Sequence, residues 1–389
     1  MRLLGSLDSI AFADLLDLCR DEEPRTAYPE NGSFTIQARN GRDYWYFRGY
    51  ERPMDGSAGR ATLRYVGAAE DPSILKLVDA HGRRHASYKK RNSLASRLRR
   101  SGLPAPQPIE GAVTGVLAGA GLFRNGSTLV GSVAFQTYGG LLGGKLEGSG
   151  HRTDDLDAGQ PPLLEIDPKA DPVDILAALK GADPTVEPVF HGGHPDLVAG
   201  FANASKFKVG FLTPRRSQRN AKDGALAEFG GLPGIGARTS PYFEYLLKDP
   251  VTSVMRHGAG IAVRVPDPMR YATHKLIVAV QRRAPGTESR AEPKAAKDIR
   301  QAEAVIEAAA HARATTALGE AWLDAWARGP QWRRLLREGS LRLGREPLHI
   351  LAAAATEAAI LNGTDDPFAS STDPRAALLA DPGHRHMAE

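Results

Sequence analysis

The sequence predicts an α+β protein in three structured regions, and three observations support this fold class. Apolar and polar residues alternate around a tight turn signal in the first hundred residues, which is typical of antiparallel strands. Short strand-like and helix-like segments alternate loosely in the middle of the chain, and helical periodicity dominates after Pro268. We therefore expect a helix with a small sheet and a basic helix, then a mixed core, a helical bundle and a disordered tail, at residues 1–103, 109–266, 267–362 and 363–389.

The composition is that of an ordinary globular chain. Its 389 residues suffice for two or three domains, and the net charge of +5 is compatible with polyanions such as nucleotides or nucleic acid. The single cysteine, Cys19, excludes an internal disulfide and favours a reducing environment. Aspartates interrupt the first apolar segment, unlike a secretory signal, and the apolar run 111–123 is too short for a membrane span. We expect a soluble, cytoplasmic protein with no membrane partner.

The first region begins with an amphipathic helix over residues 1–25. Asn40-Gly41 is the strongest turn signal that follows, because both residues readily adopt the positive φ of a two-residue hairpin. It joins the first two strands of a small antiparallel sheet with an aromatic face, at residues 33–38, 43–48 and 61–66.

A long helix rich in arginine and lysine is expected from Asp71 to Ser101. One interpretation is a solvated charged surface with arginine stems lying over the core. The other is a patch for nucleic-acid phosphates, assisted by the aromatic residues of the preceding sheet. The second interpretation assigns nucleic-acid binding to Arg97, Arg99 and Arg100.

The central region follows a linker at 102–108, whose three prolines resist both helix and sheet. A helix of small residues over 112–123 leads to a short apolar strand ending at Val130, then Gly131-Ser132 and a helix over 133–142. Asp155-Leu156-Asp157 is expected on a second strand. The remaining elements are a helix, a strand, a polar loop, a short helix and a hairpin, at 173–179, 206–213, 215–236, 242–247 and 253–265.

The third region shows helical periodicity only. Five helices are expected at 269–283, 295–314, 318–327, 332–338 and 348–361. We expect Trp322, Trp326 and Trp332 to lie in the core of this bundle. The tail after Gly363 is rich in Asp, Pro and Ser, which is typical of disorder.

The residues around Gly131 and Asp155 carry the chemistry. Asp155 and Asp157 are two residues apart on a strand, so their side chains point to the same side. Paired carboxylates suit a hard divalent cation such as Mg²⁺ or Mn²⁺, which commonly bridges protein carboxylates to substrate phosphates. A Gly131-Ser132 turn at a helix start presents backbone N–H groups to an anion. This order indicates chemistry on a nucleoside triphosphate.

These two motifs resemble the signature of the DNA polymerase β-like nucleotidyltransferase superfamily, a Gly-Ser turn followed by a strand with Asp-x-Asp. More narrowly, the chain is similar to bacterial nucleotidyltransferase-fold proteins related to the AbiE-type toxins of abortive-infection systems. The similarity covers about residues 30–340. Besides the two motifs it includes Tyr44-Trp45-Tyr46, Arg64-Tyr65-Val66-Gly67, Leu129 to Gln136, Arg152-Thr153-Asp154-Asp155 and Arg270 to Ile277.

The resemblance implies a polymerase β-like core and an enzyme that moves an NMP from an NTP to a hydroxyl of RNA, such as tRNA, or of protein. Asp155 and Asp157 would hold one or two Mg²⁺ or Mn²⁺ ions, and Gly131 and Ser132 would bind the terminal phosphates. Lys275 would pair with the triphosphate, and the following Lys297-Asp298 resembles a further motif of the AbiE-type group. A toxin or defence role follows from the same resemblance.

One position departs from the superfamily pattern. A later strand usually carries a third carboxylate, yet the strand 207–214 has Gly210 where an acid is expected. Another acid could reach the site, and candidates are Asp154, Glu165 and Asp196. Alternatively, water accepts the proton, or catalysis is weak or lost. In that last case the chain is a non-catalytic protein that binds nucleotide or nucleic acid.

Other motif matches are weaker. Gly139 to Lys145 fits the spacing of a phosphate-binding G-x-x-x-x-G-K loop, but Leu146 replaces the required Ser or Thr and no strand precedes it. His191 and His194 could bind a metal, but they flank Gly192-Gly193 and have no third ligand nearby. Exposed loop histidines are the simpler interpretation.

Overall fold

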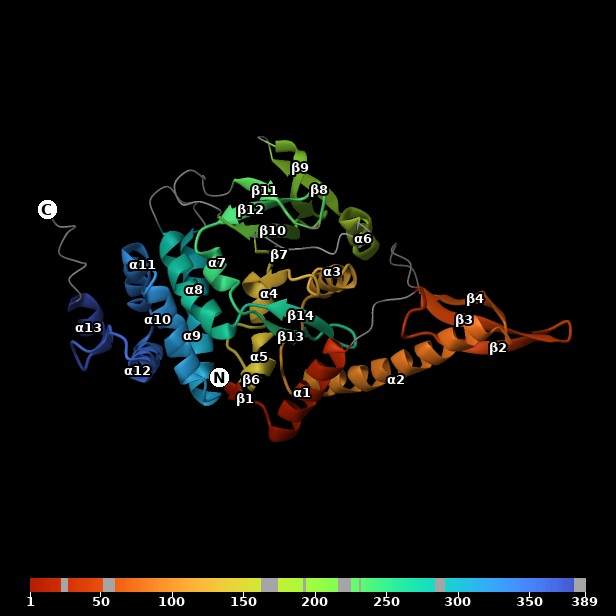
Figure 1. The fold of residues 1–389 in the computed structure, drawn as a ribbon, viewed down its shortest axis with the longest axis horizontal. Coiled ribbons are helices and arrows are strands. Elements are labelled where there is room, and N and C mark those ends of the chain that lie inside the picture. Colours follow the sequence, from red (N-terminus) through yellow and green to blue (C-terminus); the bar gives the residue numbers. More distant parts are fainter. Residues whose placement is uncertain are drawn as a thin grey trace.

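The computed structural model describes residues 1–21, 27–51, 60–161, 174–191, 194–215, 225–230, 232–283 and 291–380. Helices and sheets both contribute substantially, which confirms the predicted mixture of α and β structure. Figure 1 shows a body that contains the central sheet and the C-terminal helices, and an arm that extends from it. None of the helices in the described ranges is long and apolar enough to span a membrane.

The arm consists of three antiparallel strands and one long helix, namely β2 (Ser33–Arg39), β3 (Arg42–Glu51), β4 (Arg60–Ala68) and α2 (Pro72–Arg100). Asn40 and Gly41 connect β2 to β3 with positive φ values of 50° and 74°, as the sequence predicts for this turn. Asp71 caps α2 by accepting a hydrogen bond from the backbone N–H of Ser73. The 29 residues of α2 span about 43 Å at 1.5 Å per residue.

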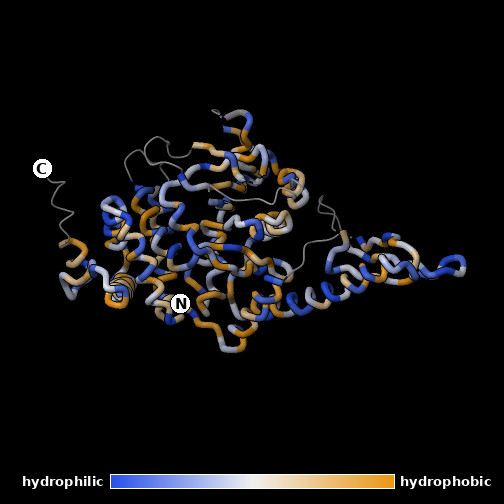
Figure 2. Tube along the Cα trace, in the orientation of Figure 1, coloured by the Kyte–Doolittle hydropathy of each residue, from blue (hydrophilic) through white to orange (hydrophobic). Residues whose placement is uncertain are grey.

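The far end of α2 attaches the arm to the body. There α1 (Ser6–Arg20) lies against α2, and Phe12 and Leu15 share a small hydrophobic cluster with Leu98. Arg97 Nε also lies 2.9 Å from Asp8 Oδ1. Figure 2 shows hydrophilic residues along much of α2, whereas hydrophobic segments gather in the body. The arm is therefore fixed at one end and surrounded by solvent along much of its length.

A seven-stranded mixed sheet forms the centre of the body. Its main path is β11-β12-β10-β7-β5, and the hairpin β8-β9 joins it through β10. The neighbours β7, β10 and β12 are parallel, whereas β5 runs antiparallel to β7. The strand bounds are β5 (Thr128–Val130), β7 (Asp155–Gly159), β8 (Glu187–His191), β9 (His194–Ala202), β10 (Lys208–Pro214), β11 (Leu226–Glu228) and β12 (Gly236–Ser240).

Smaller elements surround this sheet. The hairpin expected over 253–265 is present as β13 and β14, and a second small sheet pairs β1 with β6. The bounds are β1 (Arg2–Leu3), β6 (Gly144–Lys145), β13 (Val251–Met255), β14 (Ile261–Val265), α3 (Pro108–Gly119), α6 (Ile175–Ala182) and α7 (Phe243–Leu246).

The helix expected over residues 133–142 is instead two short helices, α4 (Gly131–Phe135) and α5 (Tyr138–Leu141). The break falls at Thr137, whose N–H and hydroxyl both donate to the Ala134 carbonyl in place of an α-helical hydrogen bond. The Thr137 carbonyl accepts a 3.1 Å hydrogen bond from the Ser253 hydroxyl. The glycine that follows admits α1 closely, because a Cβ atom on Gly140 would lie 2.0 Å from the Phe12 ring.

The C-terminal helices are α8 (Pro268–Gln281), α9 (Ala291–His311), α10 (Thr315–Trp326), α11 (Pro330–Ser340), α12 (Arg345–Asn362) and α13 (Pro374–Ala380). Trp322 and Trp332 are buried, as expected, and Trp326 is half-buried. The tail differs from the expected disorder, because α13 is formed and Phe368 and Leu378 are buried against the bundle. Residues 381–389 lie outside the described part.

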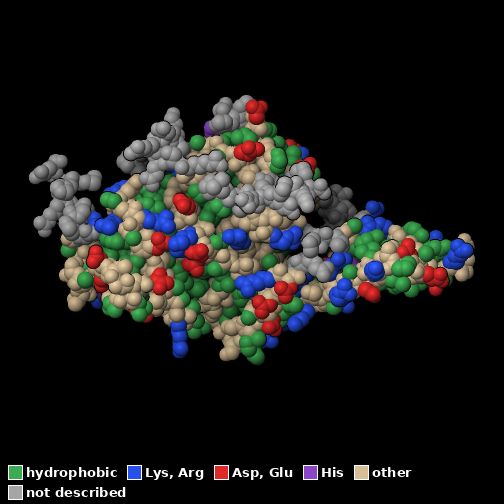
Figure 3. All heavy atoms as spheres, in the orientation of Figure 1, with side chains coloured by type: hydrophobic (Ala, Val, Ile, Leu, Met, Phe, Trp, Pro, Cys, Tyr) green, Lys and Arg blue, Asp and Glu red, His purple; other side chains and the backbone are tan. Residues whose placement is uncertain are grey.

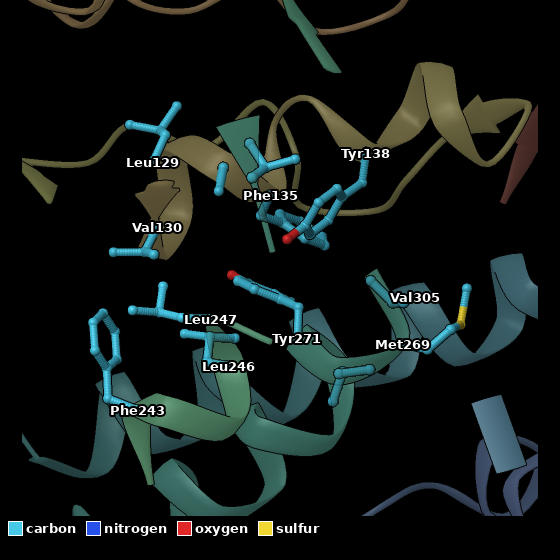
Figure 4. Close-up of a cluster of buried hydrophobic side chains, with 14 of the residues drawn as sticks. Leu129, Val130, Phe135, Tyr138, Phe243, Leu246, Leu247, Met269, Tyr271 and Val305 are labelled. Carbon is cyan, nitrogen blue, oxygen red and sulfur yellow. The ribbon is translucent and has the colours of Figure 1, made fainter. Parts of the chain in front are cut away.

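One hydrophobic cluster runs from the sheet into these helices. Figure 4 shows Leu129, Val130, Phe135 and Tyr138 facing Phe243, Leu246, Leu247, Met269, Tyr271 and Val305. The Tyr138 hydroxyl donates a 3.0 Å hydrogen bond to the carbonyl of Pro266. The regions predicted at 109–266 and 267–362 thus share a core, which fixes α8 and α9 against the end of β5.

Candidate functional site

The strand pair β5 and β7 brings the two predicted motifs together. Val130 ends β5 and lies opposite Asp157, so the chain leaves the sheet beside that carboxylate. Gly131 then turns with φ +71°, a conformation that favours glycine, and begins α4. A Cβ atom on Gly131 would lie 4.0 Å from Asp157 Oδ2. The small-residue turn and the acid are therefore direct neighbours.

The two acids of β7 differ in their surroundings. Asp155 is exposed, and its Oδ1 accepts a 2.5 Å hydrogen bond from the Thr153 hydroxyl. Asp157 is largely buried, and this burial, with the Asp155 charge, raises its pKa from 3.8 to about 6. Arg238, Lys275 and Arg282 oppose that rise. Burial and the neighbouring acid thus disfavour ionised Asp157 more than the surrounding cations favour it.

Gly210 is the partner of Asp157 across β7 and β10. A Cβ atom on Gly210 would lie 2.3 Å from Asp157 Oδ1, so the carboxylate occupies the space that a side chain would need. The same Cβ position is 3.6 Å from Arg238 Nη2. The strand that usually carries a third acid in the resembled superfamily therefore contributes no side chain here, and Asp157 and Arg238 lie beside its backbone instead.

Arg238 was not among the predicted site residues. The residue lies on β12, next to β10 in the sheet, and its side chain is exposed. The segment before it was expected to be a polar loop up to 236, and no strand was expected at 236–240. Only the sheet order β12-β10-β7 places Arg238 beside the acids, and no signal in the sequence gives that order.

Residues from α8 and α9 support the turn at Gly131. The Tyr271 hydroxyl lies 3.1 Å from the Gly131 carbonyl oxygen and 2.9 Å from Gln301 Oε1. Gln301 Nε2 in turn lies 3.5 Å from the Ser132 hydroxyl. Tyr271 is buried and stacks against Phe135, with ring centroids 6.1 Å apart. These contacts hold the Gly131-Ser132 turn against α8 and α9. Neither Tyr271 nor Gln301 was a predicted site residue.

Lys275 lies on the same helix and forms a buried ion pair. Its Nζ is 2.5 Å from Asp298 Oδ1, and Arg282 Nε is 2.7 Å from Asp298 Oδ2. Burial acts to raise the pKa of Asp298, but Lys275 and Arg282 outweigh it and hold this pKa below 3.8. Lys275 is thus fixed in position, and its charge also acts on Asp157.

Lys297 adds a further cation to the group. Burial and the Lys275 charge lower the pKa of Lys297, whereas Asp155 acts to raise it. Lys297 therefore lies within electrostatic reach of the exposed acid, one residue before the buried Asp298. Lys297-Asp298 was expected near the site only from the family resemblance.

The candidate third acids are not drawn into the site. Asp154 and Asp196 are exposed, and Glu165 lies outside the described residues. In the part of the chain that the structure describes, no group of three or more His, Cys, Asp or Glu side chains is arranged to hold a metal ion. Protein ligands for a cation at this site would accordingly be the two carboxylates of β7.

The weaker motifs lie in other settings. Gly139 to Lys145 divides between α5 and β6, and β6 pairs with β1, so no phosphate-binding loop forms there. His191 is exposed and pairs with His194 at the end of the β8–β9 hairpin. Arg97 forms the ion pair with Asp8, Arg99 donates to the Ser96 hydroxyl, and Arg100 is exposed.

Comparison with known sequences gives one match. A sequence model of a protein family described as nucleotidyltransferase matches residues 109–327, which is more than half of the chain. The matched segment includes the turn at Gly131, both acids of β7 and Lys275. No curated protein and no solved structure matches the chain.

Proposed function

Because the chain belongs to the nucleotidyltransferase family that its residues 109–327 match, we propose that it transfers an NMP from an NTP to a hydroxyl group of RNA, such as a tRNA end, or of protein. The observation that carries this proposal is the position of Asp157 beside the turn at Gly131. A carboxylate and a phosphate-sized anion can share that corner only if a cation lies between them. The finer resemblance to polymerase β-like enzymes and AbiE-type toxins agrees with this chemistry.

The donor set fits Mg²⁺ or Mn²⁺. Both ions prefer oxygen ligands and take one or two carboxylates together with substrate phosphate oxygens and water. Asp155 and Asp157 would hold the ion, and it would favour the ionised form of Asp157, which burial and the Asp155 charge disfavour. A bound ion would stabilise the negative charge that develops on the α-phosphate during transfer, and it would orient the leaving pyrophosphate.

The chain's own groups then have separate tasks. Gly131 and Ser132 bind the terminal phosphates, and Tyr271 with Gln301 keeps that turn in place. Lys275 and Lys297 provide positive charge on the triphosphate side, and Arg238 does so beside Gly210. Their fixed positions lower the barrier because little reorganisation remains when charge develops.

In the reaction the acceptor oxygen forms a bond to the α-phosphorus, and the bond from that phosphorus to the bridging oxygen breaks. Pyrophosphate leaves, and the acceptor's proton passes to solvent or to pyrophosphate, because Gly210 offers no base. This scheme predicts a slow enzyme, since a positioned general base typically contributes a factor of about 10² to 10⁴.

A direct test uses each of the four NTPs labelled at the α-phosphate, with bulk cellular RNA and bulk protein as acceptors and Mg²⁺ or Mn²⁺ present. We expect label in one acceptor class with the wild type, and at least about 10²-fold less with Asp157→Asn. Lys145→Ala is the matched control, because its exposed side chain lies on β6 and should leave transfer unchanged. Label in neither class with any NTP would contradict the proposal.

Gly210 favours a second candidate, a protein that binds nucleotide or nucleic acid without catalysis. This candidate predicts NTP binding that needs Asp157 and divalent cation, yet no labelled acceptor. Equilibrium dialysis with labelled NTP, run beside the transfer assay, separates the two candidates.

A further inference from the structure

One face of the arm's sheet presents mostly exposed or half-buried large side chains in the described part of the chain. Side chains alternate along the strands, so Tyr44, Tyr46, Arg48 and Tyr50 of β3 share one face. The register adds Arg39 of β2 and, through the pair of Tyr46 with Tyr65, Leu63 and Tyr65 of β4. We call this set the tyrosine face: Arg39, Tyr44, Tyr46, Arg48, Tyr50, Leu63 and Tyr65.

The opposite face of the same sheet packs against α2. There the Phe34 and Phe47 rings lie 5.0 Å and 5.4 Å from the His81 ring. His81 is buried and its Nε2 lies 3.2 Å from the Pro29 carbonyl oxygen. The arm therefore already has its own small core, and the tyrosine face is not needed to stabilise it.

Most residues of the tyrosine face are exposed or half-buried, although Tyr46 is buried. Tyr50 is 58% exposed, Tyr65 56% and Leu63 47%. The Tyr65 ring lies 5.9 Å from the Tyr44 ring and 5.7 Å from the Tyr46 ring. Arg39 places its guanidinium 5.5 Å from the centroid of Tyr46. Aromatic planes with an arginine beside them form a continuous surface across β2, β3 and β4.

The charge of the arm indicates what this surface binds. Residues 33–100 contain 15 Lys and Arg against 6 Asp and Glu, a net charge of +9, whereas the whole chain carries +5. The rest of the protein is therefore net negative. Figure 3 shows Lys and Arg side chains distributed along the arm. A surface of this sign attracts a polyanion and repels basic partners.

We propose that the tyrosine face binds single-stranded nucleic acid, with bases stacked on the exposed tyrosines and phosphates held by Arg39 and Arg48 of the same face. The lysines and arginines of α2, on the other side of the sheet, add to the attraction at longer range. Stacking needs unpaired bases, because those of a duplex already stack on each other. A second copy of the arm could stack on the same rings, but its own net charge of +9 would repel it. The inference rests on the proposed function in one respect. If the chain transfers an NMP, the acceptor is RNA, and the arm binds that RNA near its single-stranded end.

Fluorescence anisotropy with labelled single-stranded RNA, single-stranded DNA and duplex RNA of equal length tests this, using the full chain without NTP. We expect single strands to bind more tightly than duplex, and Tyr65→Ala and Tyr50→Ala each to weaken binding about ten-fold. Tyr65→Phe keeps the ring and should bind like the wild type. Phe190→Ala is the matched control, because this ring is 57% exposed on β8 of the body.

Arg39→Ala with Arg48→Ala should weaken all strands alike and make binding less sensitive to salt, since each lost phosphate contact lowers the salt slope by about 1. The proposal would be overturned if Tyr65→Ala and Tyr50→Ala bound single strands as tightly as the wild type, or if duplex RNA bound as tightly as single strands. It would also be overturned if the wild type self-associated and Tyr65→Ala did not. Binding without transfer to RNA would instead refute RNA as the acceptor and leave the site on the arm intact.

Discussion

Replacing Asp157 by asparagine should stabilise the metal-free protein above neutral pH. The folded state raises the pKa of Asp157 from 3.8 to about 6, mainly through burial. A shift of about two units corresponds to about 3 kcal/mol at 1.36 kcal/mol per unit. The fold disfavours the ionised carboxylate. The contribution of Asp157 to the free energy of unfolding is therefore fully present below about pH 4, where the group is protonated, and is lost as the pH rises through about 6. Asparagine is uncharged at every pH and avoids that loss.

Urea denaturation in EDTA measures this effect. Near pH 8 the free energy of unfolding of Asp157→Asn should exceed that of the wild type by about 1–3 kcal/mol, and the difference should shrink to under about 1 kcal/mol near pH 4. Added Mn²⁺ should stabilise the wild type, by about 2.7 kcal/mol at a hundred times its dissociation constant, and leave the variant unchanged. Lys145→Ala serves as the control in each titration, because its side chain is exposed.

A variant that is less stable than the wild type at both pH values would refute this reasoning. In that case the Asp157 carboxylate is already balanced by Arg238, Lys275 and Arg282, and the site has no need of a cation. If Asp157→Asn were more stable than the wild type by the same amount at pH 4 and pH 8, the reasoning would also fail. The stabilisation would then come from side-chain packing and not from the charge of Asp157.

Three further substitutions test the surroundings of the acids. Gly210→Ala should destabilise the fold by about 1–3 kcal/mol and reduce transfer, because its Cβ would lie 2.3 Å from Asp157 Oδ1; unchanged melting and transfer would contradict the packing. Asp298→Asn should cost about 3–5 kcal/mol in thermal or urea unfolding, since it leaves the buried Lys275 unpaired, and a loss below 1 kcal/mol would show that the pair is dispensable. Tyr271→Phe should cost only about 1 kcal/mol in stability but raise the KM for NTP, because it releases the Gly131 carbonyl; an unchanged KM would exclude this support.

The sequence was sufficient for the local parts of the structure. Asn40-Gly41 predicts its hairpin because backbone preference alone selects the turn. The alternation and spacing of Asp155 and Asp157 predict a strand, and the structure has β7 there. The expected mixture of α and β elements is confirmed, and so is the nucleotidyltransferase family. The roles of Asp155, Asp157, Gly131, Ser132 and Lys275 remain predictions.

Features that depend on distant contacts were not predictable. The helix expected over 133–142 breaks at Thr137, whose carbonyl accepts a hydrogen bond from Ser253, more than a hundred residues later. Arg238 reaches the acids only through the order of strands in the sheet. The tail forms α13 because the bundle offers a surface that buries Phe368 and Leu378. In each case tertiary packing overrides what local composition indicates.

The most direct measurement of the central claim is a titration of Mn²⁺ by electron paramagnetic resonance, with and without a non-hydrolysable NTP. The account predicts that the wild type and Lys145→Ala bind the ion more tightly when the nucleotide is present, and that Asp157→Asn loses both the ion and this enhancement. The idea that the acids of β7 and the turn at Gly131 bind the same metal–nucleotide complex would be contradicted by either of two results. One is equal Mn²⁺ affinity in all three proteins, and the other is a wild-type Mn²⁺ affinity that the nucleotide does not change.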